Sequence, residues 1–548
     1  MSDAYRPPDN YPRIFVGTGS CGLAAGAGKV FDAAKKFVRD AGLDIHLIRT
    51  GCIGMCHQEP VVEVHVPGRP RVIYGNVRPE QLKTLLGAHF FHTRLSPQPG
   101  LVGQRPPDPE ALPHEGVPTV AEHPFFAGQT QKLLGRCGII DPHSLVDYEA
   151  TGGYQGIRKA LTMSPEQVIE RIKKTGLRGR GGGGFLTADK WAVAAARPGS
   201  QKYVIANGDE GDPGAFSDRT LMEGDPHAIL EGLMIAAYAV GANRGYIYTR
   251  ASYPTAIHRL EVAIAFCRKR GYLGDDMFGS GHALDLHVRK GSGAYICGEE
   301  TALIASLEGR PPMPESKPPQ PAVQGYLGHP TVVNNVETLA SVSYAMAVPK
   351  AGKNTADTKL LSLSGSIARP GVVEVPFGTT LRQVIFEIGG GMLNGKHFKA
   401  VLVGGPDGGF LPESLLNHPI DFDALRTIGS MLGSGGLVVV DQDTCMVGLA
   451  RYFEKFEAEA SCGKCVPCRV GTTRLVERLD RIIRGEADAT ELVDLEHLCK
   501  VVHEGSLCGL GRAAPNPVTS ALAHFADDFS AHIAGRCPTG ACEREAEA

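Results

Sequence analysis

The amino-acid sequence predicts a multidomain α/β protein that ends in a helical domain. The chain has 548 residues, far more than a single hydrophobic core usually contains. Strand-like and helix-like patterns alternate over residues 12–90 and again, less regularly, over residues 125–350. From residue 441 onward the pattern is mainly helical. Together these three observations predict several α/β units followed by a helical bundle.

The first unit is predicted to cover residues 1–93. "RIFVGTG" reads as a strand, and "GAGKVFDAAKKFVRDAG" reads as an amphipathic helix that a glycine ends. Three strand-like runs follow, "IHLIRTG", "VVEVHV" and "RVIYG", before a closing helix, "RPEQLKTLLG". Residues 94–124 contain eight prolines, so we expect an extended linker there.

The remaining chain divides into three predicted domains. Residues 125–350 mix helices such as "DPHAILEGLMIAAYAVGA" with short strands such as "YVIANG" and "RGYIYTR", which indicates an α/β sheet. Residues 351–440 are rich in strands and turns with one helix, "TLRQVIFEIG", and are predicted to form a β-grasp-like module. Residues 441–548 form the predicted helical domain and a cysteine-containing tail.

Composition and charge exclude some classes of function. The net charge of −3 offers no basic excess for nucleic acid. No apolar run is long enough to span a bilayer, and the N-terminal residues lack the pattern of a secretion signal. We therefore expect a soluble, cytoplasmic protein without nucleic-acid or direct membrane contacts, and its 14 cysteines as thiols or metal ligands.

A glycine-rich stretch, "LRGRGGGGF" at residues 177–185, predicts a ligand-binding loop. Glycines let the backbone approach a ligand closely, and N–H groups at the start of a following helix favour an anion such as phosphate. Arg178 and Arg180 are expected to add positive charge. Polar stretches recur near predicted strand ends, namely "NGDEGDPGAFSDR", "GSGAYICGEETALIASLEGRPPMPESKPP" and "VVNNVETLA". This density of polar groups indicates a ligand crevice.

The cysteines of the helical domain predict a [4Fe–4S] cluster. Cys462, Cys465 and Cys468 form a C-x2-C-x2-C run, and Cys508 follows at a distance. Three close thiolates and one remote thiolate are typical of such clusters, whereas structural zinc favours two separate C-x2-C pairs. In the tail, Cys537, Cys542 and His532, with Cys445 as a fourth ligand, are candidates for a zinc site. Unligated thiols are the alternative.

The four polar stretches together resemble the NADH-binding flavoprotein subunit of respiratory complex I and its relatives. Those relatives include the diaphorase subunits of NAD-dependent formate dehydrogenases and of NAD-reducing or electron-bifurcating hydrogenases. The resemblance covers roughly residues 130–530 and includes the C-x2-C-x2-C cluster motif. It implies that the chain binds FMN, NAD(H) and a [4Fe–4S] cluster, and that residues 351–440 form the module called SLBB.

The resemblance also implies site residues by motif match. Positions expected to line FMN are Gly179, Arg180, Gly181, Lys190, Asn207, Asp209, Glu210, Tyr295, Gly298, Glu299, Asn334, Asn335 and Thr338. Positions expected to face NADH are Phe185, Asp212, Glu300 and Lys317, and the cofactor site also includes Gly182, Gly183, Gly184 and Gly211. The flavin supplies the hydride chemistry, so we expect Glu299 and Glu300, the candidate catalytic pair, to order the site and tune nucleotide affinity. The sequence departs from the family at Val193, where an aromatic residue is usual, and at Asp212, where Glu is usual.

The N-terminal unit resembles thioredoxin-like [2Fe–2S] ferredoxins. Cys21, Cys52 and Cys56 match three of the four cysteine ligands of that fold, but Gly17 stands where the first should be. Two interpretations stay open: a cluster with a substitute ligand, such as Ser20 or another polar group, or the fold without its cluster.

The predicted function is that of a diaphorase subunit, an NADH:acceptor oxidoreductase that passes electrons between NAD(H), FMN and the [4Fe–4S] cluster. The implied partners are a small thioredoxin-like [2Fe–2S] subunit and a catalytic iron–sulfur subunit of formate dehydrogenase or hydrogenase type, in an electron-bifurcating complex or a simpler one. The alternatives are the NADH-binding subunit of respiratory complex I and a non-catalytic iron–sulfur scaffold. Acidic residues around the expected ribose favour NAD over NADP.

Overall fold

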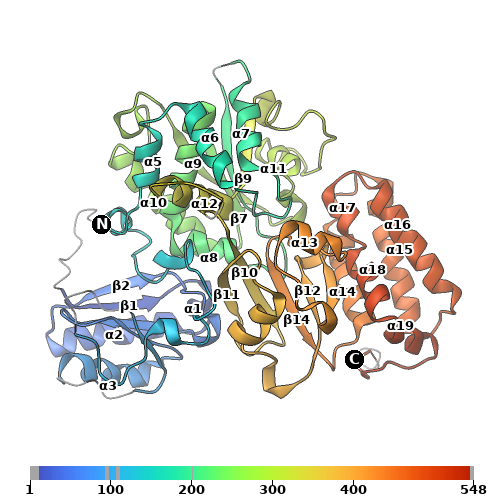
Figure 1. The fold of residues 1–548 in the computed structure, drawn as a ribbon, viewed down its shortest axis with the longest axis horizontal. Coiled ribbons are helices and arrows are strands. Elements are labelled where there is room, and N and C mark those ends of the chain that lie inside the picture. The colour runs from blue at the N-terminus through green and yellow to red at the C-terminus, as the bar shows by residue number, and fades with distance from the viewer. Residues whose placement is uncertain are drawn as a thin grey trace.

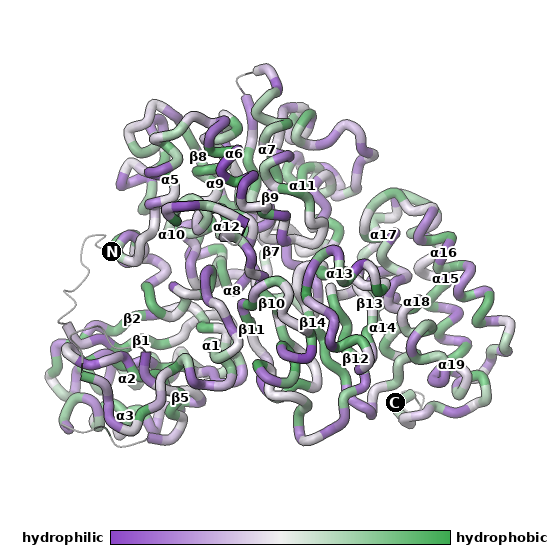
Figure 2. Tube along the Cα trace, viewed as in Figure 1, coloured by the Kyte–Doolittle hydropathy of each residue, from purple (hydrophilic) through white to green (hydrophobic). Residues whose placement is uncertain are grey.

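The computed structural model describes residues 11–92, 95, 98–105, 112–199, 201–353 and 355–542. It contains three β-sheets and a helical C-terminal region, which confirms the predicted multidomain α/β class (Figure 1). The third sheet lies between the N-terminal unit and the C-terminal helices (Figure 1). Aliphatic residues from several strands of the third sheet form a hydrophobic core, and these strands contain green stretches in the hydropathy view (Figure 2).

The N-terminal unit is a five-stranded sheet in the order β2-β1-β3-β4-β5. Only β1 and β2 are parallel; the other neighbours are antiparallel. The strands are β1 (Arg13–Gly17), β2 (His46–Thr50), β3 (Val62–His65), β4 (Val72–Tyr74) and β5 (Leu101–Gln104). The helices are α1 (Ser20–Ala24), α2 (Ala27–Ala41) and α3 (Pro79–Phe90), with a 3-10 turn η1 (Cys56–Gln58). The apolar faces of α2 and α3 pack together against the sheet.

Part of the predicted linker is a strand. Residues 101–104 form β5 and pair with β4, so the first sheet extends into the proline-rich stretch. Gln104 donates to the carbonyl oxygens of His114 and Val117 and so fixes the chain beyond the strand. Sequence reasoning missed β5 because prolines flank it closely on both sides. Residues 94, 96, 97 and 106–111 of this stretch lie outside the described residues.

The second sheet is fully parallel, in the order β8-β7-β6-β9. Its strands are β6 (Tyr203–Gly208), β7 (Arg244–Arg250), β8 (Asp285–Gly291) and β9 (Thr331–Asn335). The helices of this domain are α4 (Leu145–Ala150), α5 (Gln155–Ala160), α6 (Pro165–Thr175), α7 (Thr187–Ala195), α8 (Ser217–Gly224), α9 (Pro226–Val240), α10 (Pro254–Lys269), α11 (Glu300–Leu307) and α12 (Val336–Ala347). Helix α9 is buried along almost its whole length, and this explains its nearly uniform apolar sequence.

The third sheet has the order β11-β10-β14-β12-β13. Its strands are β10 (Thr358–Gly365), β11 (Gly371–Pro376), β12 (Phe398–Val403), β13 (Gly409–Pro412) and β14 (Gly436–Asp441), with helix α13 (Phe422–Thr427) beside them. The C-terminal helices are α14 (Met446–Ala460), α15 (Val466–Ile483), α16 (Thr490–Gly505), α17 (Gly509–Ala513), α18 (Asn516–His524) and α19 (Ala526–Ile533). Helix α18 packs on β13, and this contact joins the helical region to the third sheet.

Candidate functional site

The polar strand ends of the second sheet meet at one edge. Strands β6 and β9 are parallel neighbours, and their register aligns Ala206 with Asn334 and Asn207 with Asn335. Since both strands end here, the side chains that follow them gather at the carboxyl edge, where open α/β sheets bind ligands. The Asn207 amide donates to the Gly298 carbonyl oxygen at 3.0 Å, which joins this edge to the turn before α11.

The glycine loop closes over this edge. The Gly179 N–H donates to the Phe185 carbonyl oxygen at 2.8 Å, so residues 179–185 form a closed loop at the start of α7. The Arg180 N–H donates to the Thr338 hydroxyl at 2.9 Å and fixes the loop to the first turn of α12. Gly184 has φ = 63°, a conformation that residues with a side chain rarely adopt.

The side chains of the two loop arginines interact with other residues of this chain. The Arg178 guanidinium donates to Asp423 at 2.8 Å and to the Gly184 carbonyl oxygen at 2.7 Å. Arg180 is 2% exposed, donates to the Ala356 carbonyl oxygen at 2.6 Å and lies 4.6 Å from the Phe377 ring centroid. Burial of a guanidinium requires such partners. Arg178 therefore joins the loop to α13, and Arg180 joins it to the residues just before β10 and just after β11 of the third sheet.

Two lysines and two glutamates form an ion-pair network beside the loop. Glu300 accepts from Lys190 at 2.9 Å and from Lys317 at 2.8 Å, and Lys317 also donates to Glu299 at 2.8 Å. The second carboxylate oxygen of Glu299 accepts from the N–H groups of Thr301 and Ala302 and caps α11. Although burial opposes ionisation of Glu300, the two ammonium groups hold its pKa below the ordinary value.

The acidic residues after β6 differ sharply in their surroundings. Asp209 is 8% exposed, neither of its carboxylate oxygens has a partner among the described residues, and burial raises its pKa to about 7. Glu210 accepts from the N–H groups of Asp218 and Arg219 at the start of α8. Asp212 accepts from the Ser434 hydroxyl at 2.7 Å, which places it against the third-sheet module. Asp209 thus has the unused hydrogen-bonding capacity that a bound, hydroxyl-rich ligand would satisfy.

Other positions named from the sequence are placed by their exposure and close contacts. The Phe185 side chain is 75% exposed at the end of the loop, and Val193 is 40% exposed on α7. A Cβ on Gly211 would lie 2.7 Å from the Tyr295 ring, so no larger residue fits there without a shift. Gly181, Gly182 and Gly183 lie in the turn of the loop itself.

Trp191 is not among the site residues that the sequence predicts. Its indole N–H donates to the Asn334 side-chain oxygen at 2.9 Å, and the ring is fully buried. The tryptophan therefore fixes the orientation of an expected site residue. Its spacing gave no hint of this, because α7 and β9 are far apart in sequence.

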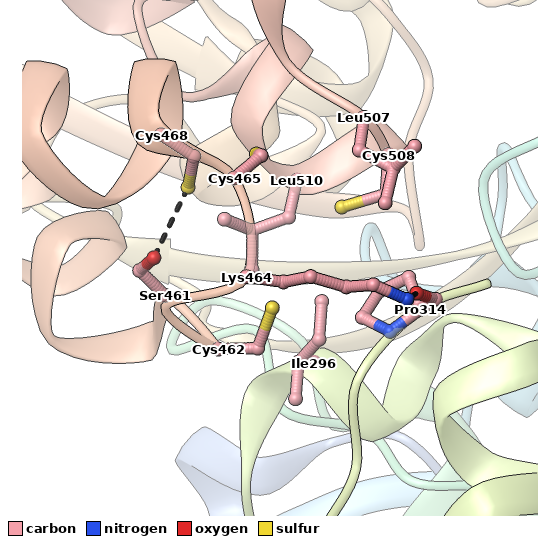
Figure 3. A pocket seen from close by; sticks show the side chains of 10 residues that line it. All are labelled: Ile296, Pro314, Ser461, Cys462, Lys464, Cys465, Cys468, Leu507, Cys508 and Leu510. Atoms are coloured by element: carbon pink, nitrogen blue, oxygen red, sulfur yellow. Dashed lines mark hydrogen bonds between the residues drawn. The ribbon is translucent and has the colours of Figure 1, made fainter. Parts of the chain in front are cut away.

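The four cysteines of the predicted [4Fe–4S] site line one pocket (Figure 3). Cys465 and Cys508 precede α15 and α17, Cys468 lies in the first turn of α15, and Cys462 follows α14. Ile296 and Leu510 contribute an apolar wall. Burial raises the pKa of Cys468 to about 12, so its thiolate requires a nearby cation such as cluster iron.

Three carboxylates on or beside α14 were missed by sequence reasoning, and one of them, Glu457, interacts electrostatically with Cys508 of this pocket. Glu454 and Glu457 on α14 are fully buried, and none of their four oxygens has a hydrogen-bond partner among the described residues. Asp407 accepts from the Tyr295 hydroxyl at 2.7 Å, while its other oxygen has no such partner. Burial raises the pKa of both glutamates well above the ordinary value and that of Asp407 to about 7. Glu457 lies four residues after the core residue Phe453, so helical spacing could have indicated that it faces inward.

Two other groups of metal-ligating side chains converge. The ligand atoms of the four tail candidates all lie within 4.8 Å of one another: Cys445, His532, Cys537 and Cys542. The second ring nitrogen of His532 lies 2.8 Å from the Asp528 carbonyl oxygen, an arrangement typical of histidine metal ligands. The thiols of Cys21, Cys52 and Cys56 also lie within 4.8 Å of one another.

These features define a class of protein: a nucleotide-binding parallel sheet joined to a helical iron–sulfur domain. Family models match the same parts of the chain. The Nuo51 FMN-binding domain matches residues 172–344, the SLBB domain residues 361–411, and the NADH-ubiquinone oxidoreductase-F iron-sulfur binding region residues 448–532.

Individual relatives agree with these models. The NADP-reducing hydrogenase protein HndC of Solidesulfovibrio fructosivorans is 48% identical over 74% of this chain and 84% of its own. An NADH-quinone oxidoreductase subunit of Rhizobium meliloti is 46% identical over 74% of this chain and 98% of its own. A crystal structure of NAD+-reducing [NiFe]-hydrogenase aligns with a TM-score of 0.64 and 28% identity, over 96% of this chain and 85% of that one. This chain belongs to the family of FMN-binding, iron–sulfur subunits found in NADH-quinone oxidoreductases and in hydrogenases of this kind.

The chain is thus an oxidoreductase subunit with sites for FMN and a [4Fe–4S] cluster. The residues present fit both groups, since Asp209 has unsatisfied oxygens at the sheet edge and four thiols share one pocket. No described helix combines the length and apolar character needed to cross a membrane.

Proposed function

We propose that this chain exchanges electrons between NAD(H) and a partner subunit of a hydrogenase- or formate dehydrogenase-type complex. It would oxidise NADH when electrons flow to the partner and reduce NAD+ when they flow from it. The observation that carries the proposal is the position of residues 295–300. On one side, Ile296 lines the cysteine pocket. On the other, Gly298 contacts Asn207 at the sheet edge, and Glu300 binds both lysines. One short segment therefore separates the proposed flavin site from the cluster site.

FMN, when bound, supplies the conversion between the two-electron chemistry of a nicotinamide and the one-electron chemistry of an iron–sulfur cluster. The chain's own residues bind and orient it. We assign flavin binding to the glycine loop, to Lys190 and to the polar groups at the ends of β6 and β9. We assign Asp209 and the neighbouring Asn207 to hydrogen bonds with its polyol chain; the assignment is supported by the Asp209 oxygens, which have no partner within the described protein.

The nucleotide is proposed to bind on the exposed side of the loop. Phe185 offers a solvent-facing ring on which a base can stack. Lys317 and Glu300 lie nearby as a charged pair and are assigned to NADH orientation. Asp212 is proposed to act indirectly, by holding the loop after β6 in place, since its carboxylate accepts from Ser434 and from the Gly214 N–H.

The kind of partner is supported by the extent of the matches. The hydrogenase structure aligns over 96% of this chain, so that likeness extends to most of the N-terminal unit, whereas the sequence matches to HndC and to the Rhizobium meliloti relative each cover 74%. A role in complex I is the second candidate, favoured because that match covers 98% of the relative's own length. Purification of the tagged chain from its own cells separates them: a hydrogenase or formate dehydrogenase subunit supports the proposal, and membrane-arm subunits support the alternative.

The activity itself has a direct test. The purified chain should be yellow-brown and reduce ferricyanide with NADH. A colourless protein, or a coloured one that NADH does not reduce, would favour a scaffold role. We expect a higher kcat/KM for NADH than for NADPH; the opposite preference would align the chain with the NADP-reducing HndC.

The tail group is proposed to bind one zinc ion. Three thiols and one imidazole within 4.8 Å match a tetrahedral structural site, in which Zn–S distances are about 2.3 Å. Metal analysis should give about one zinc per chain, and Cys542→Ser should lower it. Iron without zinc would remove this assignment.

A further inference from the structure

The N-terminal cysteines form three corners of a metal site. Cys21 lies in α1, Cys52 follows β2, and Cys56 begins η1, yet their sulfur atoms lie within 4.8 Å of one another. Three thiols from separate elements gain little from packing together, whereas thiolates are strong iron and zinc ligands. The resemblance to thioredoxin-like ferredoxins implies a fourth ligand at position 17, where this chain has a glycine without a side chain.

A carboxylate fills the space beside Gly17. A Cβ built on Gly17 would lie 3.1 and 3.2 Å from the two carboxylate oxygens of Glu59. Glu59 Oε1 lies 3.8 Å from the Cys21 sulfur, and Oε2 accepts from the Val61 N–H at 2.9 Å. The side chain is 6% exposed, and no ion pair joins it to a lysine or arginine of the described residues. The acid group thus stands where a thiol on residue 17 would project.

Ser20, the substitute that the sequence suggested, has other partners. Its hydroxyl donates to Glu223 on α8 at 2.5 Å, and its N–H donates to the other oxygen of the same carboxylate at 2.7 Å. These bonds join α1 to the nucleotide-binding domain. The hydroxyl is therefore used in the domain interface and is not free to bind metal.

We propose that Glu59 is the fourth ligand of a [2Fe–2S] cluster held by Cys21, Cys52 and Cys56. Two observations carry the assignment: three thiols converge, and the carboxylate beside them occupies the place of the missing thiol. A buried carboxylate without a cation is costly, and a metal supplies that cation. Carboxylate and thiolate are both anionic ligands, so the exchange conserves the ligand charge of an all-cysteine site. This inference does not rest on NADH oxidation.

Metal content of the full-length protein, purified without oxygen, tests the ligand assignment. The wild type should contain about six iron atoms and six acid-labile sulfides per chain, four from one cluster and two from the other. Glu59→Gln keeps the size of the side chain but removes its charge, and it should lower iron to about four while FMN content stays unchanged. Glu223→Gln is the matched control at a carboxylate that faces Ser20, and it should retain about six.

A ligand swap keeps the inference falsifiable if Glu59→Gln fails to fold. Gly17→Cys combined with Glu59→Ala removes the carboxylate and restores a thiol, so iron should return to about six with an altered EPR spectrum. Four irons in the wild type, six in Glu59→Gln, four in the swapped variant, or zinc in place of iron at this site would each overturn the inference.

Discussion

The ion-pair network beside the glycine loop and the carboxylates on the other side of the segment 295–300 differ in their electrostatics. In the network, Glu299, Glu300, Lys190 and Lys317 each have an oppositely charged partner, although Asp209 at the same sheet edge has none among the described residues. On the helical side, Glu454 and Glu457 are buried and Asp407 is half-buried, and most of their oxygens have no partner among the described residues. The network therefore fixes charge where the nucleotide is proposed to bind, whereas burial favours the neutral form of the Glu454 and Glu457 carboxyl groups on the helical side.

The largest expected effect comes from the cysteine pocket on the helical side. Cys508→Ser takes away the remote ligand of the [4Fe–4S] cluster, so iron should fall by about four atoms per chain. FMN content should stay unchanged, because the sheet side of the segment does not depend on Cys508. Iron and flavin analysis of the same sample measures both. Retention of the iron would mean that the cysteine pocket is not the cluster site.

The next largest effect tests the ion-pair network on the sheet side. Glu300→Gln leaves Lys190 and Lys317 with one less compensating charge, so a nucleotide diphosphate should be attracted more strongly. We expect NADH to bind about fivefold more tightly, on the order of 1 kcal/mol, with the gain decreasing in high salt. Titration calorimetry or flavin quenching gives the Kd. An unchanged affinity would contradict the proposed role of the network, and Glu315→Gln, an exposed neighbour, is the control.

A smaller effect tests the buried glutamates of the helical side through the pH dependence of stability. Burial raises the pKa of Glu454 in the folded state above its value in the unfolded state. At a pH between these two pKa values, folding is therefore accompanied by the uptake of a proton. Stability from this group is present below the unfolded pKa and is lost as the pH rises toward the folded pKa. Glu454→Gln removes this loss, and its apparent Tm should exceed that of the wild type by about 2–4 °C at pH 8.

The control for that experiment lies on the same helix. Glu459 is exposed and forms only a long ion pair with Lys455, so Glu459→Gln should change the Tm equally little at pH 6 and pH 8. A Glu454→Gln advantage that is the same at both pH values would show that the wild-type carboxylate does not exchange a proton on folding.

The smallest expected effect concerns the hydrogen bond between Trp191 and Asn334 at the sheet edge. Trp191→Phe removes the N–H that donates to Asn334 and leaves a buried amide oxygen without that donor. The cost of about 1 kcal/mol should lower the apparent Tm by about 2 °C and weaken FMN retention. A variant with unchanged Tm and flavin content would show that packing alone places Asn334.

One side of this comparison was far more predictable from the sequence than the other. The glycine loop, Lys190, Asn207 and Glu300 lie in dense polar motifs, and parallel strands necessarily bring their ends together. Glu454 and Glu457 sit in an ordinary amphipathic helix, "LARYFEKFEAEA", where a charged residue is usually solvated. Only the packing of α14 buries them. Glu59 was missed for a related reason, because its relation to Gly17 exists only once the chain has folded.

The central claim is that one short segment couples a flavin site to an iron–sulfur site within this chain. The most direct measurement is an anaerobic titration of the purified protein with NADH, followed by flavin absorbance and by EPR of the cluster. NADH should bleach the flavin band, and the EPR signal of a reduced [4Fe–4S] cluster should appear with it, but not in Cys508→Ser. A flavin that NADH reduces while the wild-type cluster stays oxidised, even at excess NADH, would contradict the central claim.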